Sequence, residues 1–347
     1  MMPHKLVLIG FGTVGQGLVE ILRDKGDILR RNLGFDAQIV AVTTLTRGSV
    51  YQPEGLDPDQ LLETGDSGGT FDNFPGSPGL VRGWDSLQTI RDSNADTVVE
   101  VSYTDIETGQ PAIDYCRAAF MSGKNVVTAN KGPTALAYPE LSALAKEKGV
   151  RWGFEGTVMS GTPALRVPLT ALAGNDISQV RGIFNGTTNY ILTKMEDGLS
   201  YEAALEQAQD LGYAEADPTA DVEGYDALAK VIILANVVMN MPLPVDQVAC
   251  QGISQLTPAD IAQAKAGGKR WKLIGRISRQ GEQIRAGVGP EMVSLTDPLA
   301  HVMGASNAIT YECDLAGPIT LIGPGAGRTE TGFSILVDLI NIQRNNI

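Results

Sequence analysis

KLVLIGFGTVGQGLVEIL, residues 5–22, places an apolar run, a G-x-G-x-x-G turn and the start of an amphipathic stretch in immediate succession. In this order of strand, turn and helix the glycine pattern predicts a dinucleotide site. The glycines allow a tight turn and a close approach of the backbone to a pyrophosphate, whose charge the amino end of a helix attracts. The alternative is a glycine-rich turn without a ligand. The residues expected to contact the cofactor are Gly10, Phe11, Gly12, Thr13, Val14 and Gly15.

The first 150 residues alternate short apolar runs with amphipathic stretches, which is typical of βαβ units around a mostly parallel sheet. Residues 47–84 are rich in Gly, Pro, Asp and Ser, and we expect them to form a lid or a mobile loop outside the sheet. The rest is expected to be a Rossmann-like dinucleotide-binding domain. The expected strands are Lys5–Ile9, Gln38–Thr43, Thr97–Val101 and Asn125–Thr128, and the expected helices are Val14–Leu29, Gly109–Met121 and Pro139–Lys148, the last capped by Gly149.

After residue 150 strands and helices follow in a different order, which is typical of an α+β domain. The expected strands are Arg151–Phe154, Val180–Phe184, Leu273–Ser278, Ile284–Val288 and Ile309–Cys313. The expected helices are Pro163–Leu172, Tyr201–Leu211, Tyr225–Met239 and, after a tight loop at 323–327, Phe333–Ile342. We therefore expect a nucleotide-binding domain (1–132), a second domain (133–322) and a C-terminal loop and helix (323–347).

The composition excludes several classes of protein. Of 347 residues, 40 are acidic and 27 basic, so the net charge is −13, and a nucleic-acid binder would need stripes of lysine and arginine instead. No apolar run approaches the roughly 20 residues of a membrane span. Three scattered cysteines argue against disulfides and favour a cytoplasmic location. Two histidines, His4 and His301, are too few for a metal site of imidazole and thiolate.

The carboxyl end of the second strand bears on which dinucleotide binds. An acid about 20 residues beyond the glycines would hold a ribose diol, but Asp36 precedes the strand and so lies at its wrong end. The strand instead runs into TTLTR (residues 43–47), with hydroxyls and an arginine. This favours a 2′-phosphate, and hence NADP, with Arg47 as its clamp. Two alternatives stay open: NAD as the cofactor, and Arg47 as a solvated loop residue.

Two lysines are candidates for the proton donor that hydride transfer to a carbonyl needs, because both histidines are badly placed. Lys131 follows an expected parallel strand, and ligands of open α/β sheets bind at the carboxyl ends of strands. Lys230 shares a helix face with Asp226 at i, i+4 spacing. The residues after Lys230 are apolar around nearly the whole helix, so we expect a buried helix whose charges meet a polar ligand. The alternative is a surface ion pair, which contributes little.

Around these lysines the chain resembles the homoserine dehydrogenase family. The family signature A-x3-G-Y-x3-D-P-x2-D-x2-G-x-D-x3-K is met without a break by AQDLGYAEADPTADVEGYDALAK (residues 208–230). The resemblance covers nearly the whole chain, including TANKGP (128–133), EGTVMSGTP (155–163), RGIFNGTTNY (181–190) and GPGAG (323–327). It implies an NAD(P)-dependent oxidoreductase that reversibly reduces L-aspartate 4-semialdehyde to L-homoserine, on the route to threonine and methionine.

The resemblance also implies roles for single residues. Lys230 resembles the proton donor and Lys131 the lysine between cofactor and substrate. Ser102, Lys131 and Gly327 would contact the cofactor, so that the last helix returns to the first domain. The second domain would bind substrate and form a homodimer. Glu215 and Asp226 resemble the carboxylates that bind the substrate amino group and order the lysines, and Asp221 supports them. The substrate-binding residues would be Glu215, Gly186, Thr187, Asp226 and Lys131.

The loop at residues 155–162 resembles the family's monovalent-cation site. Its ligands would be Glu155 and the carbonyls of Val158, Ser160 and Thr162, and oxygen ligands suit a hard cation such as Na⁺ or K⁺. The alternative is a tight loop whose carbonyls are satisfied internally.

Two rival functions stay open. A non-catalytic NADP-sensing protein would keep the Rossmann half but not depend on Lys230. A phosphorylating aldehyde dehydrogenase needs a nucleophilic cysteine beside a base, whereas Cys116 lies within an expected helix. Many members of the family carry a C-terminal regulatory domain that senses threonine. This chain ends after the closing helix, so we expect a short form without that feedback control.

Overall fold

The chain divides into two units. The computed structural model describes residues 3–281 and 283–345. The first unit comprises residues 1–161 and 327–347, and the second comprises residues 162–326. These boundaries differ from the expected partition at 132/133 and 322/323. Residues 133–161 belong to the first unit because they contain the strand Trp152–Gly153, which pairs with Val126 and Val127 in its sheet.

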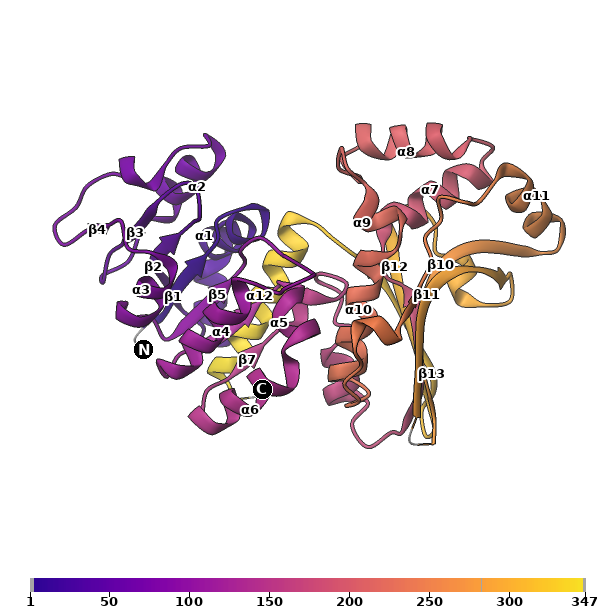
Figure 1. Ribbon diagram of the computed structural model, residues 1–347. Coiled ribbons are helices and arrows are strands. Elements are labelled where there is room, and N and C mark those ends of the chain that lie inside the picture. Colours follow the sequence, from indigo (N-terminus) through magenta and orange to yellow (C-terminus); the bar gives the residue numbers. More distant parts are fainter. Residues whose placement is uncertain (1–2, 282, 346–347) are drawn as a thin grey trace. The chain divides into compact units, whose positions relative to one another are not determined.

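The first unit is built on a seven-stranded sheet of order β4-β3-β2-β1-β5-β6-β7 (Figure 1). Five strands run parallel, and the short β3 and β4 are antiparallel additions beside β2. The expected mostly parallel α/β domain is confirmed. The strands are β1 (His4–Ile9), β2 (Ala37–Thr43), β3 (Ser49–Tyr51), β4 (Val81–Arg82), β5 (Thr97–Glu100), β6 (Asn125–Thr128) and β7 (Trp152–Gly153).

Helices cover this sheet, and local signals explain where several of them end. Gly149 has a φ of 65° and ends α6 as a left-handed C-cap, as its sequence position predicts. Asn130 starts α5 by accepting a hydrogen bond from Gly132 N at 3.0 Å. The helices are α1 (Thr13–Leu33), α2 (Pro58–Asp66), α3 (Ser86–Asp92), α4 (Ala112–Met121), α5 (Lys131–Leu136), α6 (Tyr138–Lys148) and α12 (Arg328–Gln343), with short 3₁₀ turns at Phe71–Asn73 and Glu155–Thr157.

The expectation that residues 47–84 form a lid or mobile loop outside the sheet is wrong. This segment contributes β3, α2 and β4, and it buries Leu61, Leu62, Phe71 and Phe74 in one of the unit's hydrophobic clusters. Phe71 also packs edge-on against Phe11 of the glycine turn, with ring centres 5.5 Å apart. The strands have only two or three residues each, too few for an apolar alternation to stand out in a Gly- and Pro-rich sequence.

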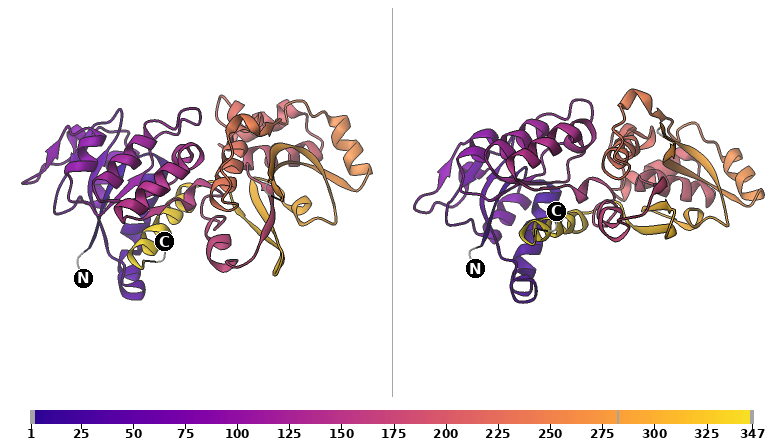
Figure 2. Two further views of the ribbon diagram at one scale, coloured as in Figure 1. Left: turned by 60° about the horizontal axis from the view of Figure 1, so that its bottom comes forward. Right: turned by 90° about the horizontal axis from the view of Figure 1, so that it is seen from below.

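Helix α12 lies against α1 within the first unit (Figure 2). Glycines allow this close approach: a Cβ on Gly17 would lie 2.1 Å from Arg328 O, and one on Gly332 would lie 2.6 Å from Gly17 C. Arg328 also donates to Glu20 at 2.7 Å and 3.1 Å. The last helix is therefore packed and ion-paired against the helix that follows the glycine turn.

The second unit is an α+β fold around a six-stranded sheet of order β13-β12-β8-β10-β11-β9 (Figure 1). Helices α7, α10 and α11 pack against β10. The strands are β8 (Ile177–Ile183), β9 (Ala249–Cys250), β10 (Lys269–Gln280), β11 (Gln283–Ser294), β12 (Ser306–Cys313) and β13 (Gly317–Pro324). The helices are α7 (Gly186–Glu196), α8 (Tyr201–Asp210), α9 (Thr219–Val222), α10 (Tyr225–Val237) and α11 (Pro258–Ala266), with 3₁₀ turns at Val245–Gln247 and Pro298–His301.

Three local expectations for the second half need correction. Residues 151–154 give a two-residue strand, β7, which belongs to the sheet of the first unit. The helix expected at 163–172 is a five-residue π-helical segment, Val167–Ala171. The tight loop expected at 323–327 is partly strand, because β13 continues to Pro324. None of the described helices is both long and apolar enough to span a membrane.

Candidate active site

The glycine turn after β1 has the geometry of a dinucleotide site. Gly10 has a φ of +98°, and a Cβ there would lie 2.4 Å from Val101 O, so this position needs glycine. Gly12 is the N-cap of α1 and supplies no capping side chain, and a Cβ on it would meet no atom within 4 Å. No side chain therefore caps the amino end of α1, and there is open space beside Gly12. A pyrophosphate fits such an end, because both the dipole and the amides of the helix attract anions.

The residues expected around the nicotinamide lie at the same edge of the sheet. β1 pairs with β2 on one side and β5 on the other, and dinucleotides bind at such a switch in strand order. A Cβ on Gly10 would lie 2.8 Å from Ser102 N, so the segment after β5 touches the turn. Lys131 begins α5 just after β6, the next strand of the sheet. The turn, Ser102 and Lys131 thus follow the carboxyl ends of three neighbouring strands.

Arg47 is engaged within the first unit rather than solvated. Its guanidinium donates to Thr64 O at 3.2 Å and to Gly65 O at 3.5 Å, in the last turn of α2. It also lies over the Phe71 ring, 5.7 Å from the ring centre. Its Nε is buried without a hydrogen-bond partner in the described chain. Asp36 accepts from Arg30 at 3.1 Å beside the amino end of β2, the wrong end for a ribose, as expected.

Lys230 and Asp226 form a largely buried ion pair on α10 in the second unit. Lys230 Nζ donates to Asp226 Oδ2 at 2.7 Å and to Phe184 O at 2.6 Å. The Lys230 side chain is 8% exposed and the Asp226 side chain 18%. All eleven residues of Ala227–Val237 are buried, which confirms the expectation of a buried helix. The alternative of a surface salt bridge is therefore wrong.

Asn185 joins this pair to a second carboxylate. Its Nδ2 donates to Asp221 Oδ1 at 2.6 Å and to Asp226 Oδ2 at 2.9 Å, while its Oδ1 caps α7 by accepting from Thr188 N at 2.9 Å. The resemblance includes residues 181–190 but assigns no role to Asn185. Its position between a strand and a helix start, where asparagine is a preferred N-cap, is the signal that could have found it.

The cluster of Asp221, Asp226 and Lys230 carries two carboxylates against one ammonium. Burial, followed by the charge of Asp226, raises the pKa of Asp221, and the Asn185 hydrogen bond and the Lys230 charge oppose this rise. With both carboxylates ionised the cluster has one unbalanced negative charge. Such a buried site favours a cationic ligand, for example the ammonium of an amino acid.

The other residues expected to bind substrate differ in where they lie relative to this cluster. Thr187, in the first turn of α7, donates its hydroxyl proton to Tyr213 O at 2.6 Å. Gly186 begins α7 where a Cβ would lie 2.6 Å from Ala305 O. Glu215, on the loop after α8, has an exposed side chain that makes no hydrogen bond to the cluster in the described chain.

The candidate cation loop has an unusual backbone. Met159 and Ser160 both have left-handed φ angles, 58° and 52°, which are rare for residues other than glycine and concentrate at functional sites. Glu155 is 4% exposed, and Ser160 Oγ lies 2.7 Å from Thr331 Oγ1. Val158 is fully buried in the same loop. Thr162 belongs to the second unit, where its hydroxyl donates to Pro324 O at 3.2 Å.

The cysteine and histidine positions bear on the rival chemistry. Cys116 is buried in α4, and burial raises its pKa well above that of a reactive thiol, so it does not suit a nucleophile. His301 Nε2 lies 2.8 Å from Leu295 O, and burial lowers the pKa of His4. Across residues 3–281 and 283–345, no three His, Cys, Asp or Glu residues come together as metal ligands.

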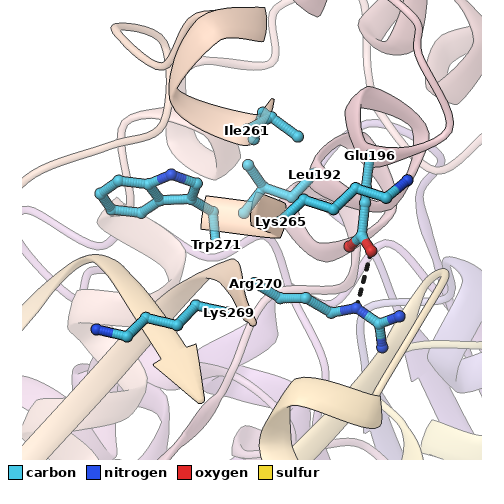
Figure 3. A pocket seen from close by; sticks show the side chains of 7 residues that line it. All are labelled: Leu192, Glu196, Ile261, Lys265, Lys269, Arg270 and Trp271. Carbon is cyan, nitrogen blue, oxygen red and sulfur yellow. Dashed lines mark hydrogen bonds and ion pairs between the residues drawn. The ribbon is translucent and has the colours of Figure 1, made fainter. Parts of the chain in front are cut away.

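A small pocket in the second unit lies outside the candidate site (Figure 3). Its volume of about 10 Å³ suits one water and not a cofactor. Arg270 Nε donates to Glu196 Oε1 at 2.9 Å across it. The pocket is lined by Leu192, Glu196, Ile261, Lys265, Lys269, Arg270 and Trp271.

Together, an open glycine turn at a sheet switch point and a buried lysine among carboxylates define the class of nicotinamide-dependent dehydrogenases. The family model of the homoserine dehydrogenase NAD-binding domain matches residues 10–155, and that of homoserine dehydrogenase matches residues 163–340. The chain belongs to the homoserine dehydrogenase family.

Relatives and solved structures agree with this assignment over nearly the whole chain. The NAD(+)-dependent homoserine dehydrogenase of Pseudomonas canavaninivorans is 45% identical, covering 99% of this chain and 97% of that protein. The homoserine dehydrogenase of Methanocaldococcus jannaschii is 42% identical over 97% and 98% of the two chains. A hyperthermophilic archaeal homoserine dehydrogenase in complex with NADPH has a TM-score of 0.85 at 29% identity and covers 99% and 98%. The oxidoreductase prediction is confirmed, and the non-catalytic alternative is not favoured.

Proposed function

We propose that this protein catalyses the reversible, NAD(P)H-dependent reduction of L-aspartate 4-semialdehyde to L-homoserine, on the route to threonine and methionine. The observation that carries the proposal is the cluster of buried Lys230 with the partly buried Asp226 and Asp221. Placing a buried lysine between two partly buried carboxylates is costly unless these charges are used, and a protein that only senses a cofactor has no use for them. The cluster also supplies what the reaction needs: a proton donor for the carbonyl and a negative site for the substrate ammonium.

Lys230 is the proposed proton donor. An ammonium has three N–H donors, and in the described chain Asp226 and Phe184 O take two of them. The third is left for the carbonyl oxygen of the substrate. A bound nicotinamide supplies the hydride. Lys230 therefore stabilises the developing oxyanion and protonates it, by positioning and electrostatics and without a covalent intermediate.

The other site residues have supporting roles in this proposal. Asp226 holds the Lys230 charge in its buried position, and Asp221 supports both. Glu215 would bind the substrate ammonium from its exposed loop. Gly186 and Thr187 lie at the amino end of α7, which suits the substrate carboxylate. Lys131, at the start of α5, would polarise the carbonyl from the cofactor side.

For the cofactor we propose NADP, with NAD as the alternative. The glycine turn, Ser102 and Gly327 would bind parts common to both. Arg47 provides a positive charge just beyond β2, where a 2′-phosphate would lie. Two observations favour NAD instead: the Arg47 guanidinium already donates to α2, and the 45% identical relative is named as NAD(+)-dependent.

We also propose a monovalent cation, a homodimer and a cytoplasmic location. The left-handed backbone at Met159 and Ser160 supports a cation held by Glu155 and the carbonyls of Val158, Ser160 and Thr162. Activity and melting temperature that do not respond to Na⁺ or K⁺ would remove this support.

The dimer would form through the second unit and give a sedimentation mass of twice 36.8 kDa. The three cysteines are unpaired, which suits a reducing compartment.

The direct test is oxidation of L-homoserine, followed by the nicotinamide absorbance with NAD and NADP in parallel. We expect turnover with at least one cofactor and formation of an aldehyde product. The absence of turnover with both cofactors would overturn the proposed function.

A further inference from the structure

Glu100 is a buried carboxylate that the proposed mechanism does not use. It is the last residue of β5 and is 0% exposed. The strand ends at the edge of the sheet where the glycine turn, Ser102 and Lys131 gather. A buried carboxylate without a function is costly, which points to a role for the hydrogen bonds that it accepts.

Both oxygens of Glu100 accept hydrogen bonds from neighbouring segments. Oε1 accepts from the backbone amide of Ser102 at 3.0 Å and also from the Ser102 hydroxyl. Oε2 accepts from Thr128 Oγ1 at 3.0 Å, at the end of β6. Glu100 therefore ties the loop after β5 to the end of β6.

The same network continues to the residue before Lys131. Thr128 Oγ1 accepts a hydrogen bond from Asn130 N at 2.9 Å, and Asn130 Nδ2 donates one to Tyr103 O, in the segment after β5, at 3.1 Å. Asn130 Oδ1 caps α5 at Gly132 N. Hydrogen bonds thus link the carboxylate to both segments that meet at this edge, and Lys131 lies in the second of them.

We propose that Glu100 is a positioning residue for the nicotinamide end of the cofactor, acting through Ser102 and the Thr128–Asn130 turn. This rests on the proposed function, since it assumes a nicotinamide cofactor at this edge. The network requires an acceptor at both oxygens. The donors that reach Glu100 are all neutral, and burial raises the pKa of this carboxyl. The ionised form of Glu100 is therefore stabilised by its hydrogen bonds from the Ser102 amide, the Ser102 hydroxyl and the Thr128 hydroxyl.

The test compares a whole cofactor with a fragment that lacks nicotinamide, using binding alone. Kd is measured by calorimetry for NADH against ADP-ribose, and for NADPH against 2′-phospho-ADP-ribose. Glu100→Gln replaces one acceptor oxygen by a donor, and Thr128→Val removes the hydroxyl that links Glu100 to Asn130. Thr128→Ser restores that hydroxyl.

A matched control lies at the opposite end of β5. Thr97 is also fully buried, and its Oγ1 lies 2.7 Å from His4 Nε2. Thr97→Val removes a buried hydroxyl from the same strand, far along it from the glycine turn. It should lower the melting temperature without changing either Kd.

We expect Glu100→Gln and Thr128→Val to raise Kd for the reduced cofactor about tenfold, as expected for unsatisfied buried donors. Kd for the matching fragment should stay within about twofold, and Thr128→Ser should bind like the wild type. Equal losses for cofactor and fragment, or no loss in Thr128→Val, would overturn the proposal. Because only binding is read, a failure here is distinct from a failure to oxidise L-homoserine.

Discussion

Lys230 Nζ lies 2.7 Å from Asp226 Oδ2, one helical turn away on a helix that is buried along eleven consecutive residues. The pair is therefore more than a surface i, i+4 contact. Removing either partner breaks this direct ion pair and leaves a hydrogen bond of the other unmade, which is destabilising in proteins. This relationship decides how variants of the site should behave.

Asp226→Asn should lower kcat/KM for L-homoserine at least tenfold, because Lys230 loses its directly bonded carboxylate and its fixed position. It should also lower the free energy of unfolding by about 2 kcal/mol, somewhat less than the loss for a fully buried pair. Steady-state kinetics and urea unfolding measure the two effects. Asp197→Asn is the control, since Asp197 pairs with Lys194 at 3.1 Å on an exposed surface. If both variants behaved alike, Asp226 would have no special role.

Asn185→Ser should move the acid limb of the kcat/KM profile to higher pH. Burial and Asp226 raise the pKa of Asp221, and the hydrogen bond from Asn185 opposes that rise. Without this bond the carboxyl becomes easier to protonate, so activity is lost at a less acidic pH. Serine keeps a capping oxygen for α7, which separates this effect from helix stability. An unchanged acid limb would remove Asn185 from the electrostatics of the site.

Lys272→Met should change how stability depends on pH. Lys272 is 1% exposed and donates to Asn189 Oδ1 at 2.9 Å, and burial lowers its pKa from 10.5 to about 8. Between these values the native state loses the proton while the unfolded chain keeps it. The unfolded state then binds more protons, so the free energy of unfolding rises with pH over this window, by about 3 kcal/mol.

The measurement is urea unfolding of wild type and Lys272→Met at several pH values between 8 and 10.5. The variant should lose the rise contributed by Lys272. Lys265→Met, at an exposed position, should retain it. An identical pH slope in wild type and Lys272→Met would show that Lys272 keeps its ordinary titration.

Arg47→Ala should raise KM for NADP about tenfold and leave KM for NAD within about twofold, if the guanidinium meets a 2′-phosphate. It should also lower the melting temperature, because the contacts with Thr64 O and Gly65 O are lost. Exposed Arg31 supplies the control, Arg31→Ala. A lower melting temperature with an unchanged cofactor preference would leave Arg47 a purely structural role.

Sequence patterns predicted the parts of the fold whose physical signal is local. The apolar run before Gly10 and the amphipathic stretch after it predicted β1 and α1, and the all-round apolar sequence after Lys230 predicted a buried helix. In contrast, β3 and β4 are too short for a visible alternation, so the sheet extension in residues 47–84 was missed.

The site was only partly predictable for a related reason. Lys230 and Asp226 are four residues apart, so their contact follows from helical spacing. Asn185 reaches Asp221 and Asp226 across 36 and 41 positions, and Glu100 reaches Thr128 across 28. Such contacts depend on the tertiary fold, and one sequence has no periodic signal for them.

The most direct test of the account is the rate of L-aspartate 4-semialdehyde reduction by wild type and Lys230→Ala, with saturating reduced cofactor and substrate. The account predicts rapid oxidation of the nicotinamide by the wild type and a kcat lower by about two orders of magnitude or more in the variant. Cofactor Kd should be the same in both proteins. A variant with a near-normal kcat and only a raised KM would contradict the assignment of Lys230 as the proton donor.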